Sequence, residues 1–225
     1  MLRIRLHYAK SKEAMYISHL DLMGVFERSL KRADINVKHS EGFNPRPEIV
    51  FAYPLSVGIE SRAELCDVFL EEHYDESVFI KLLNNALPTG ITILAASYVD
   101  NKEKSLMSQV ESAVYEITFE IPEDVIYMST PKELEKLNNE IEENFEKYYK
   151  QDEIFVNKKT KKGLVEVDIK KQIIRRDKLA PNKYSFKVRA GSVDNLKPEL
   201  IVQGFEEFIS GKIDNSIKRV KIILA

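Results

Sequence analysis

Two short runs of the chain concentrate the residues that could do chemistry. The first is Tyr16-Ile17-Ser18-His19-Leu20-Asp21, and the second is Ser40-Glu41-Gly42-Phe43-Asn44-Pro45-Arg46-Pro47. The imidazole of His19 could donate or accept a proton near neutral pH. In the second run, a glycine and two prolines stiffen a turn that presents Arg46, an arrangement typical of an anion-binding loop.

Both runs also have a purely structural interpretation. Ser18 and Asp21, three positions apart before an apolar-periodic segment, are typical of a helix cap with a capping-box acid. A proline-flanked Arg46 fits a tight connector equally well. The sequence leaves both interpretations open.

Hydrophobic periodicity predicts the elements that position these runs. We expect strands over residues 2–7, 48–53, 63–71 and 91–98 and helices over 18–33 and 76–86, with Arg3 and Arg5 on a solvated face of the first strand. This β-α-β-β-α-β order is that of a ferredoxin-like unit, whose helices cover one sheet face and leave the other open. Asp67, in the third strand, is either buried with Arg46 or His19 as its partner, or faces water at an edge.

The second half predicts a similar order with an insertion. We expect strands over residues 110–121, 183–189 and 217–224, a hairpin or bent strand over 154–157 and 163–169, and helices starting at Thr130 and near Pro198. The expected apolar residues of the two helices are Leu134, Leu137, Ile141, Phe145, Leu200, Ile201, Phe205 and Phe208. The sequence therefore predicts an α+β chain of two tandem ferredoxin-like units with antiparallel sheets, the second with an inserted β-hairpin. They span 1–100 and 107–225, joined by a polar linker over 100–105.

Basic residues gather in the second half, between Asn157 and Arg189. They are Lys158, Lys159, Lys161, Lys162, Lys170, Lys171, Arg175, Arg176, Lys178, Lys183, Lys187 and Arg189. Phe155, Tyr184 and Phe186 are interleaved with them, so the strip resembles RNA-binding surfaces in which aromatics stack on bases and lysines contact phosphates. The alternative is a solvated hairpin whose aromatics are core residues.

Composition excludes several other classes. The net charge is −2, so any basic patch must be local, and the single cysteine, Cys66, excludes a disulfide framework and an iron–sulfur cluster held by this chain alone. The four histidines include no pair at helical metal-ligand spacing, and the chain has no glycine-rich phosphate loop and no apolar run of membrane-spanning length. We expect a cytoplasmic chain without metal, membrane or DNA partners.

The sequence also resembles a known family in the runs YISHLDL, FERSLKRADI, SEGFNPRP, PLSVGIES and ELCDVFLEE. These are similar to the radical-SAM-linked (radical-SAM-associated) proteins, a domain family of unknown function encoded beside or fused to cobalamin-binding radical SAM proteins. The resemblance covers nearly the whole chain. It implies a radical SAM partner, which would carry the iron–sulfur cluster, SAM and cobalamin, and neighbours in ribosome and RNA metabolism.

Three functions are compatible with these features. The first is an accessory RNA-binding module that partners a radical SAM enzyme in tRNA or rRNA modification, with no catalytic activity of its own. Its expected anion- and RNA-binding residues are Tyr16, His19, Asp21, Arg28, Arg32, Ser40, Asn44, Arg46, Asp67, Lys159, Lys161, Lys162, Arg175 and Arg176.

The second is a metal-independent endoribonuclease similar to the CRISPR repeat-processing enzymes. His19 would be its general acid or base, Tyr16 a proton donor and Arg46 the stabiliser of the phosphorane. The glycine-rich loop of those enzymes is missing, since its region offers only Gly204 and Gly211. The third is a module that docks the radical SAM protein without touching RNA.

Overall fold

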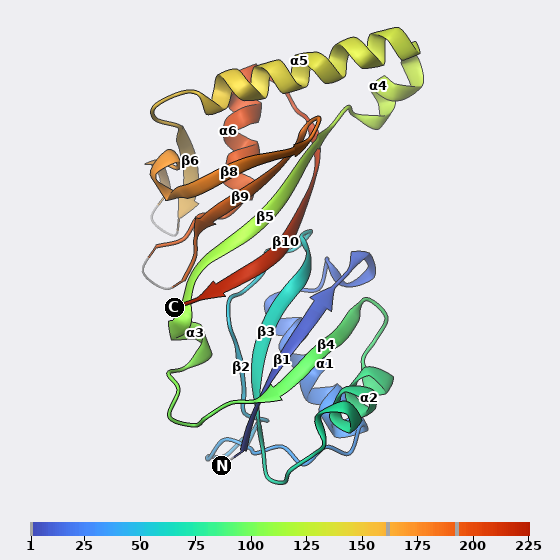
Figure 1. The fold of residues 1–225 in the computed structure, drawn as a ribbon, viewed down its shortest axis with the longest axis vertical. Coiled ribbons are helices and arrows are strands. Elements are labelled where there is room, and N and C mark those ends of the chain that lie inside the picture. Colours follow the sequence, from blue (N-terminus) through green and yellow to red (C-terminus); the bar gives the residue numbers. More distant parts are fainter. Residues whose placement is uncertain (1, 161–162, 192–193) are drawn as a thin grey trace. The chain divides into compact units, whose positions relative to one another are not determined.

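The structure is a computed structural model that describes residues 2–160, 163–191 and 194–225 (Figure 1). The chain divides into two compact units, Met1–Ser112 with Arg219–Ala225, and Ala113–Lys218. Each unit combines helices with an antiparallel sheet, so the α+β class is confirmed. In the described part of the chain, no helix is both long and apolar enough to cross a membrane.

The first unit contains two main helices and four strands that lie side by side in a sheet. Their order along the chain is β1 (Leu2–Lys10), α1 (His19–Arg32), β2 (Ile49–Phe51), β3 (Glu60–Leu70), α2 (Glu76–Ala86) and β4 (Ile91–Tyr98), with a 3₁₀ turn at Lys12–Ala14 and a short α3 at Leu106–Gln109. The strands lie in the order β4-β1-β3-β2, and each pairs with its neighbour antiparallel.

The C-terminal end of the chain belongs to the first unit. Residues Arg219–Ala225 of β10 (Asp214–Leu224) and the tail lie beside β3, where the Ser61 hydroxyl donates to the carbonyl of Arg219 at 3.3 Å. The predicted division into 1–100 and 107–225 assigns these residues to the second domain. Sequence periodicity finds the strand but carries no information about which sheet the strand's end joins.

Helix α1 begins and ends at recognisable caps. The Ser18 hydroxyl accepts the Asp21 N–H at 3.3 Å and donates to the Asp21 carboxylate at 2.6 Å. At the other end Asp34 has a left-handed φ of 54°, its N–H bonds to Lys31, and the N–H of Ile35 bonds to Leu30. These two bonds form a Schellman motif, which places residues 35–39 back alongside the helix.

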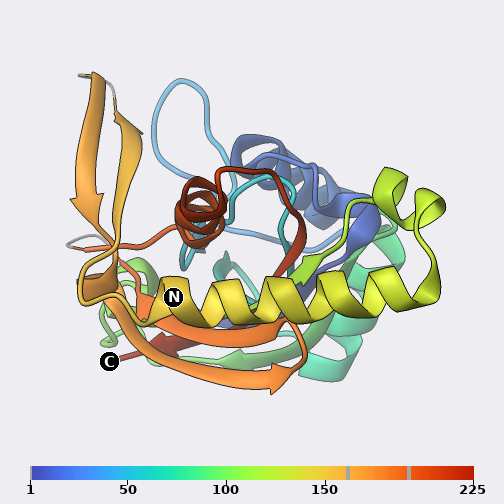
Figure 2. The same cartoon turned by 90° about the horizontal axis from the view of Figure 1, so that it is seen from above.

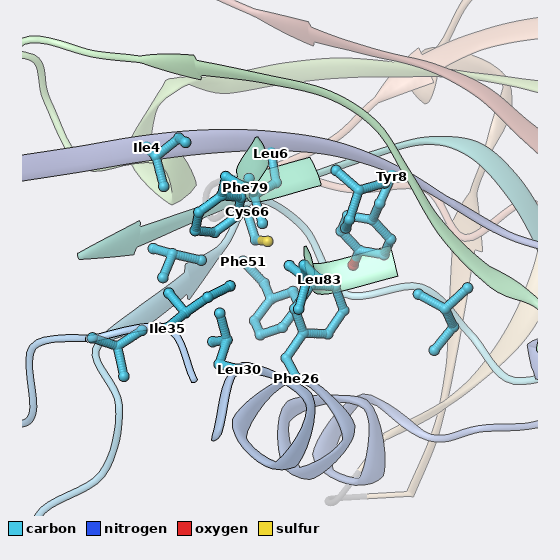
Figure 3. Close-up of a cluster of buried hydrophobic side chains, with 14 of the residues drawn as sticks. Ile4, Leu6, Tyr8, Phe26, Leu30, Ile35, Phe51, Cys66, Phe79 and Leu83 are labelled. Carbon is cyan, nitrogen blue, oxygen red and sulfur yellow. The ribbon is translucent and has the colours of Figure 1, made fainter. Parts of the chain in front are cut away.

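The core of the first unit lies between the helices and one face of its sheet (Figure 3). Tyr8, Phe26 and Phe51 form edge-to-face pairs, with ring centroids 5.1 to 6.3 Å apart. Buried aliphatic residues of both helices, including Leu30 and Leu83, complete the cluster. This packing fixes α1 and β2, which flank the candidate site.

The second unit follows a related order. Its elements are β5 (Val110–Glu120), α4 (Glu123–Met128), α5 (Pro131–Tyr149), β6 (Phe155–Thr160), β7 (Gly163–Asp168), a 3₁₀ turn (Lys170–Gln172), β8 (Ile173–Ala180), β9 (Lys183–Arg189), α6 (Glu199–Ile209) and β10. The sheet order is β10-β5-β9-β8, and β6 and β7 form a separate antiparallel hairpin that projects from the unit (Figure 2).

Several expectations for this half need correction. Strand β8 was not predicted, because its residues Ile173–Ala180 are dominated by charges instead of an alternating apolar pattern. Phe208 is 42% exposed, not buried, whereas Leu200, Ile201 and Phe205 are buried. In the helix that starts at Thr130, whose capping box with Glu133 is present, only Phe145 of the four predicted apolar residues is buried.

Candidate anion-binding site

A pocket of about 480 Å³ lies in the first unit, between the second half of α1 and the segment that follows it. Its lining residues are Glu27, Arg28, Lys31, Asp34, Ile35, Asn36, Val37, His39 and Pro47. Helical spacing puts Glu27, Arg28 and Lys31 on adjacent positions of one helix surface. The Schellman turn at Asp34 brings the remaining lining residues opposite them.

The proline-rich loop begins and ends at the wall of this pocket. His39 and Pro47, both lining residues, form an antiparallel bridge. Just beyond them, the N–H of Ser40 bonds to the carbonyl of Arg46 at 2.8 Å, and the Ser40 hydroxyl accepts the N–H of Arg46 at 3.1 Å. These bonds close the base of the loop, so its tip is held next to the pocket.

The loop tip points its side chains into solvent. Gly42 has a φ of 131°, a conformation that favours glycine, and the next side chain, Phe43, is fully exposed at 106% of its reference area. Asn44 and Arg46 are exposed as well. The ring of Phe43 and the guanidinium of Arg46 are thus exposed on a closed loop, and the pocket next to that loop is lined by two further cations.

The basic side chains around the pocket differ in their partners. Among the described residues, Arg28, Lys31 and Arg46 have no carboxylate within ion-pair distance, although Glu27 and Asp34 also line the pocket. The Arg28 guanidinium lies over Gly24, with Nη1 3.1 Å from where a Cβ would stand. Arg32 is not available in the same way, because it donates to Ser29 and to the carbonyl of Ala86.

Asp67 is buried, and its partners differ from those predicted. Its carboxylate accepts two hydrogen bonds from Arg5, at 2.7 and 3.0 Å, and lies 3.6 Å from Arg3 Nε. Neither Arg46 nor His19 is its partner. The predicted solvated face of Arg3 and Arg5 is also wrong, because Glu103, beyond β4, adds its carboxylate to the same cluster at 3.4 and 3.5 Å.

His19 is positioned by packing. It is the first residue of α1 and is half-buried, with its ring edge-on to Phe51 at 5.4 Å. Burial lowers the pKa of His19; the nearby Glu64 carboxylate acts in the opposite direction and Lys10 adds to the lowering. The imidazole is therefore mainly neutral at pH 7.

The structure does not bring His19 and Arg46 together. The ring of His19 contacts Phe51. Arg46 precedes Phe51 by five residues along an extended segment, which separates Arg46 from Phe51 by about 16 Å at roughly 3.3 Å per residue. In the described ranges no hydrogen bond or ion pair joins any two of His19, Arg46 and Asp67. Tyr16 is exposed near the start of α1, and the Asp21 carboxylate accepts from the Ser18 hydroxyl at the helix cap.

Two buried cations fix the turns around His19. Arg219 donates to Glu64 at 2.9 and 3.1 Å and to the carbonyls of Tyr53 and Pro54. Lys10 donates to the carbonyls of Ile17 and Met15, at 2.7 and 3.3 Å. Both side chains are about 1% exposed, so they hold backbone in place and do not face a ligand.

The basic strip of the second unit is not one surface. Arg176 forms a two-point pair with Glu146 of α5, Arg175 pairs with Asp177, and Lys159 is exposed on the hairpin. Tyr184 and Phe186 are fully buried in the aromatic core around Phe145, so they cannot stack on bases. Lys161 and Lys162 lie outside the described residues.

No cluster with the make-up of a metal site occurs in the described ranges: three or more His, Cys, Asp and Glu side chains do not converge at any point there. The pocket's polar side chains are two cations, two carboxylates, an imidazole and an amide. They can hold an anion or donate hydrogen bonds to one.

The chain matches a bacterial protein family over most of its length. A family described as "Uncharacterized protein conserved in bacteria (DUF2344)" matches residues 3–198, which include the pocket and the loop. The chain belongs to this family. The match spans most of both units and leaves out the first two residues and residues 199–225, which contain all of α6 and β10.

The similarity of the chain to two solved structures is low. No curated protein matches the chain. A chain of the "Crystal Structure of a Cbf5-Nop10-Gar1 Complex" is similar over 98% of this chain and 48% of that one, with 9% identity and a TM-score of 0.43. The structure of an unknown protein from Galdieria sulphuraria is similar over 97% of this chain and 98% of that one, with 12% identity and a TM-score of 0.27. Scores this low do not establish a shared fold.

Sequence reasoning missed three features of the site. Phe43 and His39 were not among the candidate residues, and the pocket itself was not foreseen. The run Gly-Phe-Asn-Pro contained a signal for Phe43, because an aromatic in the middle of a turn has few core neighbours to pack against. His39 carried no such signal, since only the pairing with Pro47 places it at the pocket.

Proposed function

We propose that the chain is an accessory RNA-binding module, and that its first unit binds an unpaired stretch of a structured RNA such as a tRNA or rRNA. The observation that carries the proposal is Phe43, a fully exposed aromatic ring on a closed loop, next to Arg46 and to a pocket lined by Arg28 and Lys31. Aromatic platforms bordered by cations are how proteins bind single-stranded nucleic acid.

Each group has a role in this proposal. The Phe43 ring stacks on an unpaired base, which every base permits because each has a π-face. Arg46, Arg28 and Lys31 contact phosphates on either side, and their lack of carboxylate partners among the described residues leaves them free to do so. The exposed Lys159 of the β6–β7 hairpin would add a second, weaker contact.

The fold proposal supports this assignment. A ferredoxin-like unit is expected to have the chain order β-α-β-β-α-β. The first unit has the chain order β1-α1-β2-β3-α2-β4 and the strand order β4-β1-β3-β2. The second has the chain order β5-α5-β8-β9-α6-β10, with β6–β7 inserted, and the strand order β10-β5-β9-β8. Many RNA-binding proteins use such units. In this chain the proposed contact is a loop beside the sheet instead of sheet aromatics.

A radical SAM enzyme is the proposed partner, on the resemblance of the SHLD and SEGFNPRP runs to radical-SAM-linked proteins. In this proposal the chain presents the RNA, and the partner supplies the iron–sulfur cluster, SAM and cobalamin. The modification reaction then takes place on the partner, in a cytoplasmic complex.

The test is RNA binding with matched variants. Labelled tRNA and a short unstructured RNA are titrated with the protein at about 50 and 200 mM salt, where phosphate-driven binding falls steeply. Phe43→Ala should weaken binding by about tenfold, the loss of one stacked base. Arg46→Ala should lower the salt slope by about one.

Two control variants make the test specific. Tyr127→Ala removes an exposed ring from the second unit, and Lys81→Ala removes an exposed cation from α2. Both should bind RNA like the parent protein. A parent protein that retains no RNA at low salt, or a Phe43→Ala variant that binds unchanged, would overturn the proposal.

RNA cleavage by His19 is the second candidate, and one observation favours it. The lowered pKa leaves a neutral imidazole that can accept a proton at pH 7. Against it, Arg46 is remote from His19 and Tyr16 points to solvent. Incubation of labelled RNA without added metal, in parallel with His19→Ala, distinguishes the two functions, because only a nuclease gives products that the variant lacks.

A further inference from the structure

The second unit contains a larger groove that the RNA proposal does not use. It has a volume of about 1050 Å³ and lies between the end of β5, the helices α4 and α5, and the turn that joins β8 to β9. Phe119, Ile121, Ile126 and Leu134 give it an apolar floor. Ile126 is 44% exposed, and Leu134 is only partly covered, so this apolar surface lacks a full partner within the unit.

All the charged residues in the described lining of the groove are acidic. Four carboxylates line it, from Glu120, Glu123, Glu135 and Asp214, and its described lining contains no Lys or Arg. In the described part of the chain none of the four has a cationic partner; Glu123 accepts from the Tyr127 hydroxyl and Glu120 from that of Ser216. Like charges gathered without counter-charges favour a cationic occupant and disfavour RNA.

One hydrogen-bond acceptor in the wall is also unused. The amide nitrogen of Asn138 donates to the carbonyl of Leu134 at 3.0 Å, so its oxygen must be the atom that accepts from the Asn182 amide, also at 3.0 Å. This assignment leaves Asn182 Oδ1 as an acceptor, and it is buried without a hydrogen-bond partner in the described ranges. Buried acceptors are normally paired, so this oxygen is available to a donor from a bound water or from an occupant of the groove.

We propose that this groove binds a segment of a partner protein in which apolar side chains are flanked by Lys or Arg. The apolar side chains fill the floor, the cations pair with the four rim carboxylates, and an N–H of the segment donates to Asn182 Oδ1. This proposal is independent of RNA binding, because the groove and the Phe43 loop belong to different units.

The β6–β7 hairpin is a described segment of the chain with similar chemistry. Leu164 is 71% exposed there, beside Lys158 and Lys159. The groove lies at the start of α5, whereas the hairpin follows the end of α5. Because a helix of 19 residues is about 28 Å long, the hairpin does not fill the groove of its own chain. A hairpin from a second copy would make a head-to-tail contact that tends to repeat without closing. The partner segment is therefore the occupant we favour.

The experiment uses the full chain and defined probe peptides. A fluorescein-labelled helical peptide with leucines at i, i+3, i+4 and i+7 and lysines elsewhere should bind, as measured by anisotropy. The same peptide with glutamates for lysines, or with serines for leucines, should not. Glu123→Lys combined with Glu135→Lys should weaken binding by about tenfold, since two exposed charge pairs are reversed.

The matched control keeps the net charge change the same. Glu143→Lys combined with Glu166→Lys reverses two exposed carboxylates outside the groove and should bind like the parent. Equal losses in the two double variants, or binding of the serine peptide, would overturn the proposal, as would no binding at all. Self-association that Lys158→Glu and Lys159→Glu abolish would assign the groove to a second copy instead.

Discussion

The guanidinium of Arg5 donates from Nε and Nη2 to the two carboxylate oxygens of Asp67, which stands directly opposite it on β3. Asp67 is 1% exposed, and Arg3 on the same strand adds a second positive charge at 3.6 Å. The buried aspartate is thus satisfied within the sheet. It is removed from the candidate anion site, where it would have repelled phosphate.

Breaking this pair should cost stability. Arg5→Met leaves a buried carboxylate with weaker compensation, so the free energy of unfolding should fall by about 3 kcal/mol in urea titrations. The exposed pair of Arg175 and Asp177 provides the control, and Arg175→Met should have a much smaller effect. Adding Asp67→Leu to Arg5→Met should recover part of the loss. Equal losses for Arg5→Met and Arg175→Met would contradict this account.

The loop side chains should be dispensable for folding. Phe43→Ala and Arg46→Ala remove groups without described partners, so the free energy of unfolding should stay within about 0.5 kcal/mol of the parent. Ser40→Ala should lower it by about 1 kcal/mol, because the N–H of Arg46 loses its acceptor. Thermal unfolding of the three variants checks this. A large destabilisation by Arg46→Ala would make the loop structural.

Asp34 is a residue whose replacement should stabilise the protein. It has a left-handed conformation, and its negative charge lies at the C-terminal end of α1, where the helix dipole disfavours it. Asp34→Gly should raise the free energy of unfolding by about 1 kcal/mol. Asp34→Ala, which keeps a Cβ, should gain less. Denaturant titration distinguishes them, and a loss of stability in Asp34→Gly would show that the carboxylate makes a stabilising contact.

Gly204 of α6 permits close packing in the second unit. A Cβ there would stand 2.5 Å from the Tyr148 hydroxyl and 2.9 Å from Val156 of the β6–β7 hairpin. Gly204→Ala should therefore destabilise the protein by about 2 kcal/mol, since the buried site cannot expand. Tyr148→Phe removes the closest atom, so the double variant should be less destabilised than the sum of the two single variants. Additive losses would contradict the contact.

Stability should depend on pH through His19. Burial lowers the pKa of His19 in the folded protein below its ordinary value of 6.5. The unfolded chain therefore binds the proton first as pH falls, so the His19 contribution is intact above about pH 6.5 and is lost as pH decreases toward the folded pKa. The charges of Glu64, which raises this pKa, and of Lys10, which lowers it, act on the ring besides its burial. Urea midpoints between about pH 5 and 8 should fall less steeply in His19→Gln than in the parent.

Local patterns were enough to predict much of the fold. The cap at Ser18, the capping box at Thr130 and the helices α1 and α6 depend on residues within one or two turns of each other, and all are present. The same holds for the strands with alternating burial, such as β1 and β9. Strand β8 was not predicted, because its charged side chains pair with α5 and with one another and the segment has no alternating apolar pattern.

The partners of charged residues, by contrast, were decided only by the tertiary structure. The sequence by itself determined that Asp67 needs a partner if buried, and that the run around Arg46 is a stiff turn. It could not determine that strand register sets Arg5 opposite Asp67, that His19 packs on Phe51, or that His39 pairs with Pro47 at the pocket lined by Arg28 and Lys31. These contacts join residues distant in the chain, and Coulomb energy depends on their separation in space, which no local pattern encodes.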